Sequence, residues 1–117
     1  MADVERTVVA HLNASGVGAP AFYSVPSERP EAFATVELTG GARRSVALED
    51  ARLAVQCWGP TRRAALELAE AAKAAVLAMP DELPDVFAAS VDSEYRDRDP
   101  DSGMPRYNLT VELTVSE

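Results

Sequence analysis

Histidine and cysteine, the side chains that most often act as bases and nucleophiles, each occur once in this sequence. His11 lies in a short segment with helical spacing. No serine or cysteine stands in a nucleophile-elbow or papain-like context, so a histidine-based triad is not supported. Cys57 alternates with Val55 on the expected inward face of a strand, where cysteine behaves as a small hydrophobe. We therefore expect His11 at the edge of the core and Cys57 to be unreactive.

A second set of residues that could do chemistry is an alternating acidic run, made of Asp97, Asp99 and Asp101. Carboxylates at alternate positions open a calcium-binding loop, but that loop needs a glycine next and a glutamate later. Ser102 occupies the glycine position and Asn108 the glutamate position, so the pattern does not predict a calcium site. A solvated hairpin tip is the main interpretation. An intermolecular contact loop that includes Arg98 is the alternative.

Two further features could serve binding. Gly40 and Gly41 precede Arg43 and Arg44, which suggests an anion grip, although glycines at a hairpin turn with exposed arginines give the same pattern. Trp58 alternates onto the face opposite the apolar one and is of a type enriched at protein interfaces; core packing under the second helix is the competing explanation. Paired carboxylates, a metal-ligand cluster and a cofactor fingerprint are all missing from the sequence. It predicts a binding or assembly module without a cofactor, and not an enzyme.

Composition narrows the class of protein. The 117 residues include 11 Lys and Arg against 19 Asp and Glu, a formal net charge of -8 at pH 7. This length fits a single domain over residues 1–117. The acid excess disfavours generic nucleic-acid binding, which depends on Lys and Arg. No apolar run approaches the roughly 20 residues of a membrane helix and the N-terminus has no signal-peptide pattern, so we expect a protein made and kept in the cytoplasm.

Two helices are expected from apolar residues at spacings of three and four. The first runs over residues 3–13 with Asp3 as its N-cap. The second runs over residues 62–79, with Thr61 as its N-cap and Pro80 as its end. Its alanine-rich buried stripe would let it lie close to a sheet.

Strands are expected where apolar and polar residues alternate or where apolar and aromatic residues cluster, over residues 21–25, 33–39, 50–58, 86–96 and 108–115. Gly40 and Gly41 would turn the chain after the second strand, and residues 97–105 would form a polar hairpin tip. The order helix, strand, strand, strand, helix, strand, strand predicts an α+β fold. An antiparallel-rich sheet of four or five strands would pack against two α-helices.

Several of these segments together carry a likeness to a known family. They are Thr39-Gly40-Gly41, Arg43-Arg44, the stretch DARLAVQCWG over residues 50–59, the alanine-rich helix after it and the closing strand RYNLTVELTV over residues 106–115. In these segments, in its opening helix and in its length, the chain resembles the tail terminator proteins of long-tailed, siphovirus-type bacteriophages. The likeness is greatest to those of actinobacterial phages. The shared motifs are structural rather than catalytic.

The resemblance implies a structural virion protein. Its small α/β subunit would form a ring, usually a hexamer, at the head-proximal end of the tail. Such a ring ends elongation of the tail tube and joins the tail to the head connector. The implied partners are other copies of the chain, the major tail tube protein and the head-to-tail connector proteins. Genome DNA would pass through the lumen without specific binding, which an acid-rich subunit favours.

A closed ring needs two different, complementary patches on each subunit. We take Arg43 and Arg44 as one patch and the acidic tip as the other, so that opposite charges meet between neighbours. The candidate interface residues are Arg43, Arg44, Trp58, Asp97, Arg98, Asp99 and Asp101. Two other interpretations stay open. One is a neck or head-to-tail connector (completion) protein, and the other is a non-viral cytoplasmic α+β module that binds a ligand as a monomer or dimer.

Overall fold

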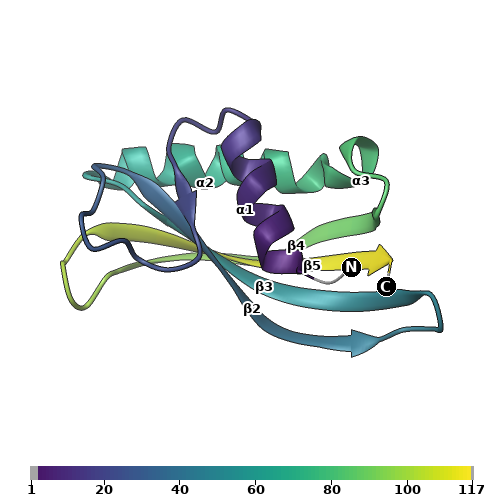
Figure 1. Cartoon of the computed structure of the whole chain (residues 1–117). Coiled ribbons are helices and arrows are strands. Elements are labelled where there is room, and N and C mark those ends of the chain that lie inside the picture. The colour runs from purple at the N-terminus through teal and green to yellow at the C-terminus, as the bar shows by residue number, and fades with distance from the viewer. Residues whose placement is uncertain (1–2, 117) are drawn as a thin grey trace.

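The computed structural model describes residues 3–116, which form one sheet with its helices on one face (Figure 1). In chain order the elements are α1 (Val4–Ala14), β1 (Ala21–Phe22), β2 (Phe33–Arg43), β3 (Leu48–Trp58), α2 (Arg62–Leu77), α3 (Met79–Glu82), β4 (Val86–Arg98) and β5 (Pro105–Ser116). The five strands lie in the order β1-β2-β3-β5-β4, with β1 parallel to β2 and all other neighbours antiparallel. The predicted α+β fold with an antiparallel-rich sheet is confirmed.

The core lies between the sheet and the two longer helices. The central strands β3 and β5 alternate as predicted, and their helix-facing side chains are buried: Ala51, Leu53, Val55, Cys57, Leu109, Val111, Leu113 and Val115. From α2 the buried side chains are Ala65, Leu68, Ala69, Ala72, Ala75 and Val76. Because most of these are alanines, the helix axis lies close to the sheet.

Helix α2 begins as predicted but ends earlier. The Thr61 side chain accepts a hydrogen bond from the Ala64 amide at 3.1 Å, which caps the helix. The helix ends at Leu77, and Pro80 does not terminate it as predicted. Instead Pro80 lies in the first turn of the short helix α3, a position where its missing N–H costs no hydrogen bond.

Helix α1 is joined to α2 by the single histidine. Asp3 caps α1 by accepting from the Arg6 amide at 2.9 Å. His11 is only 7% exposed, and its Nε2 lies 2.7 Å from the Ala75 carbonyl oxygen of α2. Because a carbonyl only accepts, Nε2 is the protonated nitrogen and donates. His11 is therefore a core-edge residue that cross-links two helices.

Gly40 and Gly41 do not turn the chain, which corrects the predicted hairpin. Strand β2 continues through both glycines to Arg43, and the turn falls at residues 44–47. A register shift just before Gly40 marks a β-bulge. A Cβ on Gly41 would lie 2.9 Å from the Asp50 carbonyl oxygen, so this position needs glycine for close strand approach.

Other strand ends also differ from the prediction. Strand β1 has two residues rather than five, since only Ala21 and Phe22 pair with β2. Strand β4 extends to Arg98 and β5 starts at Pro105, so the tip of their hairpin is residues 99–104. Two register shifts interrupt the alternation predicted for β4, and Phe87 is 58% exposed.

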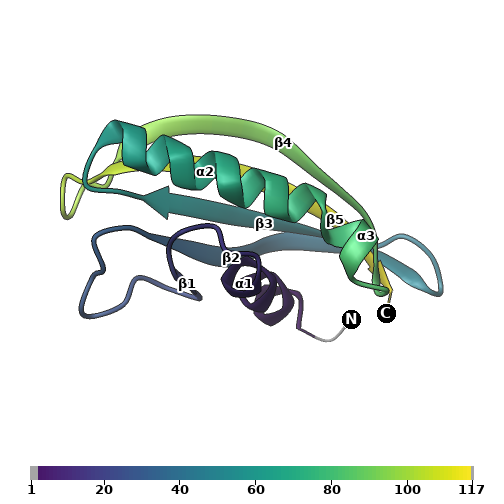
Figure 2. The same ribbon diagram turned by 90° about the horizontal axis from the view of Figure 1, so that it is seen from above.

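The molecule is elongated, 44 × 25 × 25 Å, and its two ends are different. The β4–β5 end carries the hairpin tip at residues 99–104 and the first turn of α2. The β2–β3 end carries the turn at residues 44–47 and helix α3 (Figure 1). Seen from above, α1 and α2 lie over the same side of the sheet (Figure 2).

Candidate functional site

The acidic run predicted at the hairpin tip is largely engaged within the chain. Asp97 accepts two hydrogen bonds from Arg106, at 2.8 and 2.7 Å, and a third from Asn108 Nδ2 at 3.0 Å. The Arg106 hydrogen bonds, followed by the Asn108 one, hold the pKa of the Asp97 carboxyl below its usual value. Asp97 is therefore one half of a bidentate pair across β4 and β5.

Asp99 is more deeply engaged. Its side chain is 6% exposed, and its Oδ2 accepts from Arg29 Nη1 at 2.7 Å and from Ser102 Oγ at 2.8 Å. The Asp101 amide donates to Oδ1 at 3.2 Å. Arg29 in particular holds the pKa of Asp99 far below its usual value, against the desolvation that raises it. The ion pair ties the loop between β1 and β2 to the β4–β5 tip.

Trp58 is buried beneath this tie. It is 1% exposed, its ring stacks on Phe33 with centroids 4.7 Å apart, and the Arg106 guanidinium lies 5.5 Å from its centroid. The indole N–H favours the charged form of Asp99 but does not reach hydrogen-bond geometry. A side chain this buried offers no surface to a partner, which favours packing over the interface role. The packing is not under α2 as predicted, because Trp58 stacks on Phe33 outside the core cluster that includes α2.

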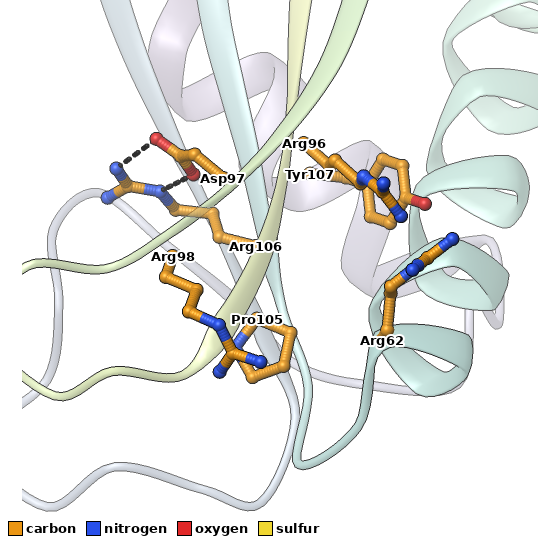
Figure 3. A pocket seen from close by; sticks show the side chains of 7 residues that line it. All are labelled: Arg62, Arg96, Asp97, Arg98, Pro105, Arg106 and Tyr107. Carbon is orange, nitrogen blue, oxygen red and sulfur yellow. Dashed lines mark hydrogen bonds and ion pairs between the residues drawn. The ribbon is translucent and has the colours of Figure 1, made fainter.

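Beside the tip lies a pocket of about 320 Å³ that is rich in arginine (Figure 3). Its lining residues are Arg62, Arg96, Asp97, Arg98, Pro105, Arg106 and Tyr107. Four of the chain's 11 basic residues thus meet in one place, although the whole chain has a net charge of -8. The sequence-predicted Asp97 and Arg98 are in this pocket; the other arginines were not predicted.

The acidic residue of the pocket faces away from most of its arginines. In the β4–β5 ladder Arg96 is opposite Tyr107 and Arg98 opposite Pro105, whereas Asp97 is opposite Arg106. Neighbouring residues of a strand point to opposite faces. Figure 3 accordingly shows the Asp97–Arg106 pair on one side of the strands and Arg96, with Arg62 of α2, on the other.

The charge on the helix side of the pocket is not neutralised within the described chain. Among residues 3–116, neither the Arg62 nor the Arg96 guanidinium forms an ion pair or hydrogen bond. Arg98 Nη1 donates only to the Gly103 carbonyl, at 2.9 Å. By contrast Arg63, next to Arg62, pairs with Glu67 at 3.8 Å. The helix side of the pocket therefore carries positive charge that an anionic group could neutralise.

The predicted arginine patch lies at the opposite end of the molecule. Arg44 Nε donates to Asp50 Oδ2 at 3.1 Å, and Asp50 also accepts from Thr114 Oγ1 at 2.8 Å. These hydrogen bonds, the Thr114 one first, lower the pKa of Asp50. Arg43 is in β2 opposite Glu49. The patch is thus mixed in charge, and it does not approach the acidic tip of its own chain.

The two residues first considered for catalysis, His11 and Cys57, are both buried. Cys57 is fully buried, and this burial, with a smaller effect of Glu94, raises the pKa of its thiol to about 12. Within the described part of the chain, no three His, Cys, Asp or Glu side chains are grouped to hold a metal ion.

An acidic turn that the sequence pattern did not single out lies at the end of the molecule opposite the arginine pocket. Asp81, Glu82 and Asp85 surround the junction of α3 and β4, and all three are exposed. Glu82 Oε2 lies 3.5 Å from His11 Nε2, and Asp85 accepts from Ser116 Oγ at 3.1 Å. Three acids within five residues are a visible signal, but only the fold shows that the turn and the arginine pocket are at opposite ends.

Comparison with known proteins does not assign this chain to a family. No protein-family model matches the chain, and no curated protein matches it. Over residues 3–116, no helix has the length and apolar character needed to span a bilayer.

Proposed function

We propose that this protein is a ring-forming structural subunit of a phage tail. Its ring, of six copies, caps the tail tube, ends its elongation and provides the surface that joins the tail to the head connector. The proposal rests on the resemblance of its sequence to tail terminator proteins and on a surface suited to assembly. It needs no catalytic group, and the chain's acid excess suits a ring through which DNA passes.

The observation that carries the proposal is the outer edge of β4. All 13 residues of this strand lie at the border of the sheet, and two aromatic side chains on it, Phe87 and Tyr95, are 58% and 57% exposed. Edge strands are usually short or covered, because their free backbone groups recruit other chains. The bulges and charges of β4 restrict which chains can pair with it. The opposite border of the sheet is different, since β1 and α1 lie there, so the subunit has two unlike sides, as a head-to-tail ring needs.

The test is the mass of the purified protein in native mass spectrometry, followed by electron microscopy with tail tubes. We expect a closed oligomer and its density on one end of each tube. Phe87→Glu should weaken the oligomer, whereas Leu66→Glu, at a 36% exposed position on α2, should leave it intact. A chain that stays monomeric when tubes are supplied would contradict the proposal. Density on the connector side of a completed tail, and none on bare tubes, would favour a neck protein instead.

A groove beside α1 supports a second candidate, a ligand-binding module. It has a volume of about 470 Å³ and is lined by Arg6, Thr7, Ala10, His11, Ala14 and Leu83. A mainly apolar groove with one histidine suits a small organic ligand. This candidate predicts a stable monomer or dimer, which the same mass measurement distinguishes from a ring.

A further inference from the structure

The arginine pocket holds charge that the dipole of α2 disfavours. A helix has a partial positive charge at its N-terminus and a partial negative charge at its C-terminus. Arg62 occupies the first position of α2, whose first turn contains no acidic residue. Asp81 and Glu82 of the acidic turn lie in the first turn of α3, where acidic side chains are favoured. The charge of the pocket therefore costs the isolated subunit stability, which a contact with opposite charge would offset.

These two charge sets are at opposite ends of the subunit. Asp85 immediately precedes β4, and Arg96 and Arg98 end the same strand. A strand of 13 residues spans about 40 Å at roughly 3.3 Å per residue, which is close to the 44 Å length of the molecule. Figure 2 shows α3 at one end of α2 and the β4–β5 hairpin tip beyond the other. No contact between the two sets is possible within one chain.

We infer that the arginine pocket binds the acidic turn of a second copy of this chain. Arg62, Arg96 and Arg98 of one subunit receive the carboxylates of the next, which are Asp81, Glu82 and Asp85. The contact is head-to-tail, and it aligns the α2 dipoles of successive subunits. The inference rests on the proposed ring and names the surfaces that would form it.

The size and the apolar lining of the pocket explain why an acidic turn fits. A volume of about 320 Å³ suits a few carboxylate side chains rather than a folded domain. Pro105 and Tyr107 offer apolar surface to the methylene groups of those side chains. An extended polyanion such as DNA would meet the repulsion of a chain with a net charge of -8 along its whole length.

The inferred contact reverses the charges of the pairing expected from the sequence. In that pairing, Arg43 and Arg44 at the β2–β3 end met the acidic tip at the β4–β5 end of a neighbour. Asp97 and Asp99 are already paired with arginines of their own chain. Arg62 and Arg96 have no such partner among residues 3–116. Unneutralised charge is therefore greater at the pocket than at the tip, and charge without a partner is what attracts a neighbour.

The experiment uses two full-length variants, each of which removes one side of the contact. Arg62→Gln/Arg96→Gln leaves the acidic turn intact, and Asp81→Asn/Asp85→Asn leaves the pocket intact. Each alone should assemble at least about 10-fold more weakly than the wild type at low ionic strength. Mixed together they should form a 1:1 dimer by sedimentation, because one intact pocket and one intact turn remain. Arg63→Gln, in the same helical turn but outside the pocket, is the matched control and should assemble normally.

The outcomes separate this inference from the proposed ring. If the wild type forms rings and both double variants form them equally well, the inference is overturned and the ring stands. If the wild type is monomeric and the mixed variants form no dimer, both are overturned. If a short DNA duplex binds the wild type but not Arg62→Gln/Arg96→Gln, while self-association is unchanged, the pocket binds phosphates and the inference is overturned. Urea midpoints no lower than the wild-type value show that the variants are folded.

Discussion

Ion pairs hold both ends of the sheet, but their surroundings differ. At the β4–β5 end, Arg29 and Asp99 pair at 2.7 Å, with side chains 28% and 6% exposed. At the β2–β3 end, Arg44 and Asp50 pair at 3.1 Å, with side chains 57% and 23% exposed. Exposed pairs contribute little because water and salt screen them, whereas removing one partner of a buried pair leaves a charge without solvent.

Packing around the two pairs follows the same division. Asp99 of the buried pair lies near the indole of Trp58, whose ring stacks on Phe33, while Val46 in the β2–β3 turn is 89% exposed. The β4–β5 end is therefore assembled before any partner binds. The β2–β3 end is held mainly by backbone pairing, and its turn is exposed.

The largest effect on stability is expected for Trp58→Ala, which tests this difference between the two ends. Removing a fully buried, stacked ring should lower the free energy of unfolding by about 3–5 kcal/mol, because a cavity remains where the ring packed. Urea denaturation followed by circular dichroism measures the loss. Val46→Ala, at the other end, should change nothing measurable. A Trp58→Ala loss below about 1 kcal/mol would show that packing does not distinguish the two ends.

A smaller effect is expected for Asp99→Asn. The substitution removes the charge that Arg29 and Ser102 engage and should cost about 2 kcal/mol in urea denaturation. It should also speed proteolysis in the loop between β1 and β2, which this residue ties down. Asp101→Asn is the matched control, because Asp101 is exposed, and should stay within about 0.5 kcal/mol of the wild type. Equal losses from both variants would contradict the role of the tie.

The same pair predicts a dependence on pH. The pKa of Asp99 is lowered in the folded chain, chiefly by Arg29. Its contribution is therefore fully present above the unfolded pKa of about 3.9 and is lost as the pH falls through the lower folded value. The difference in unfolding free energy between the wild type and Asp99→Asn should be constant from pH 7 to about pH 5 and shrink below about pH 4. A difference that grows in acid would contradict this sign.

The parts of the fold that could be predicted from the sequence are those determined by residues close together in the chain. Alternation in β3 and β5 and the Thr61 cap of α2 are read from neighbouring residues, and the structure confirms them. The role of Gly41 could not be read in this way, because glycine marks a turn and a close strand approach equally well, and only the position of Asp50 decides.

The candidate site was predicted only in part for a similar reason. Asp97 and Arg98 were noticed because they are adjacent to other charges, but Arg62 joins them only after α2 folds back over the sheet. Trp58 was placed on the correct strand face. It is buried because Phe33, distant in the sequence, stacks on it, and no periodicity reveals that contact.

The smallest effect is expected at the exposed pair. Arg44→Gln removes the 3.1 Å contact with Asp50, yet Asp50 keeps its hydrogen bond to Thr114 and stays in contact with water. The urea midpoint at neutral pH should therefore not differ from the wild-type value by more than replicate error, and adding salt should not change this. Self-association should be unaffected too, if copies meet through the arginine pocket and the acidic turn. A variant that folds normally but no longer assembles would place the contact at the β2–β3 turn instead of the arginine pocket.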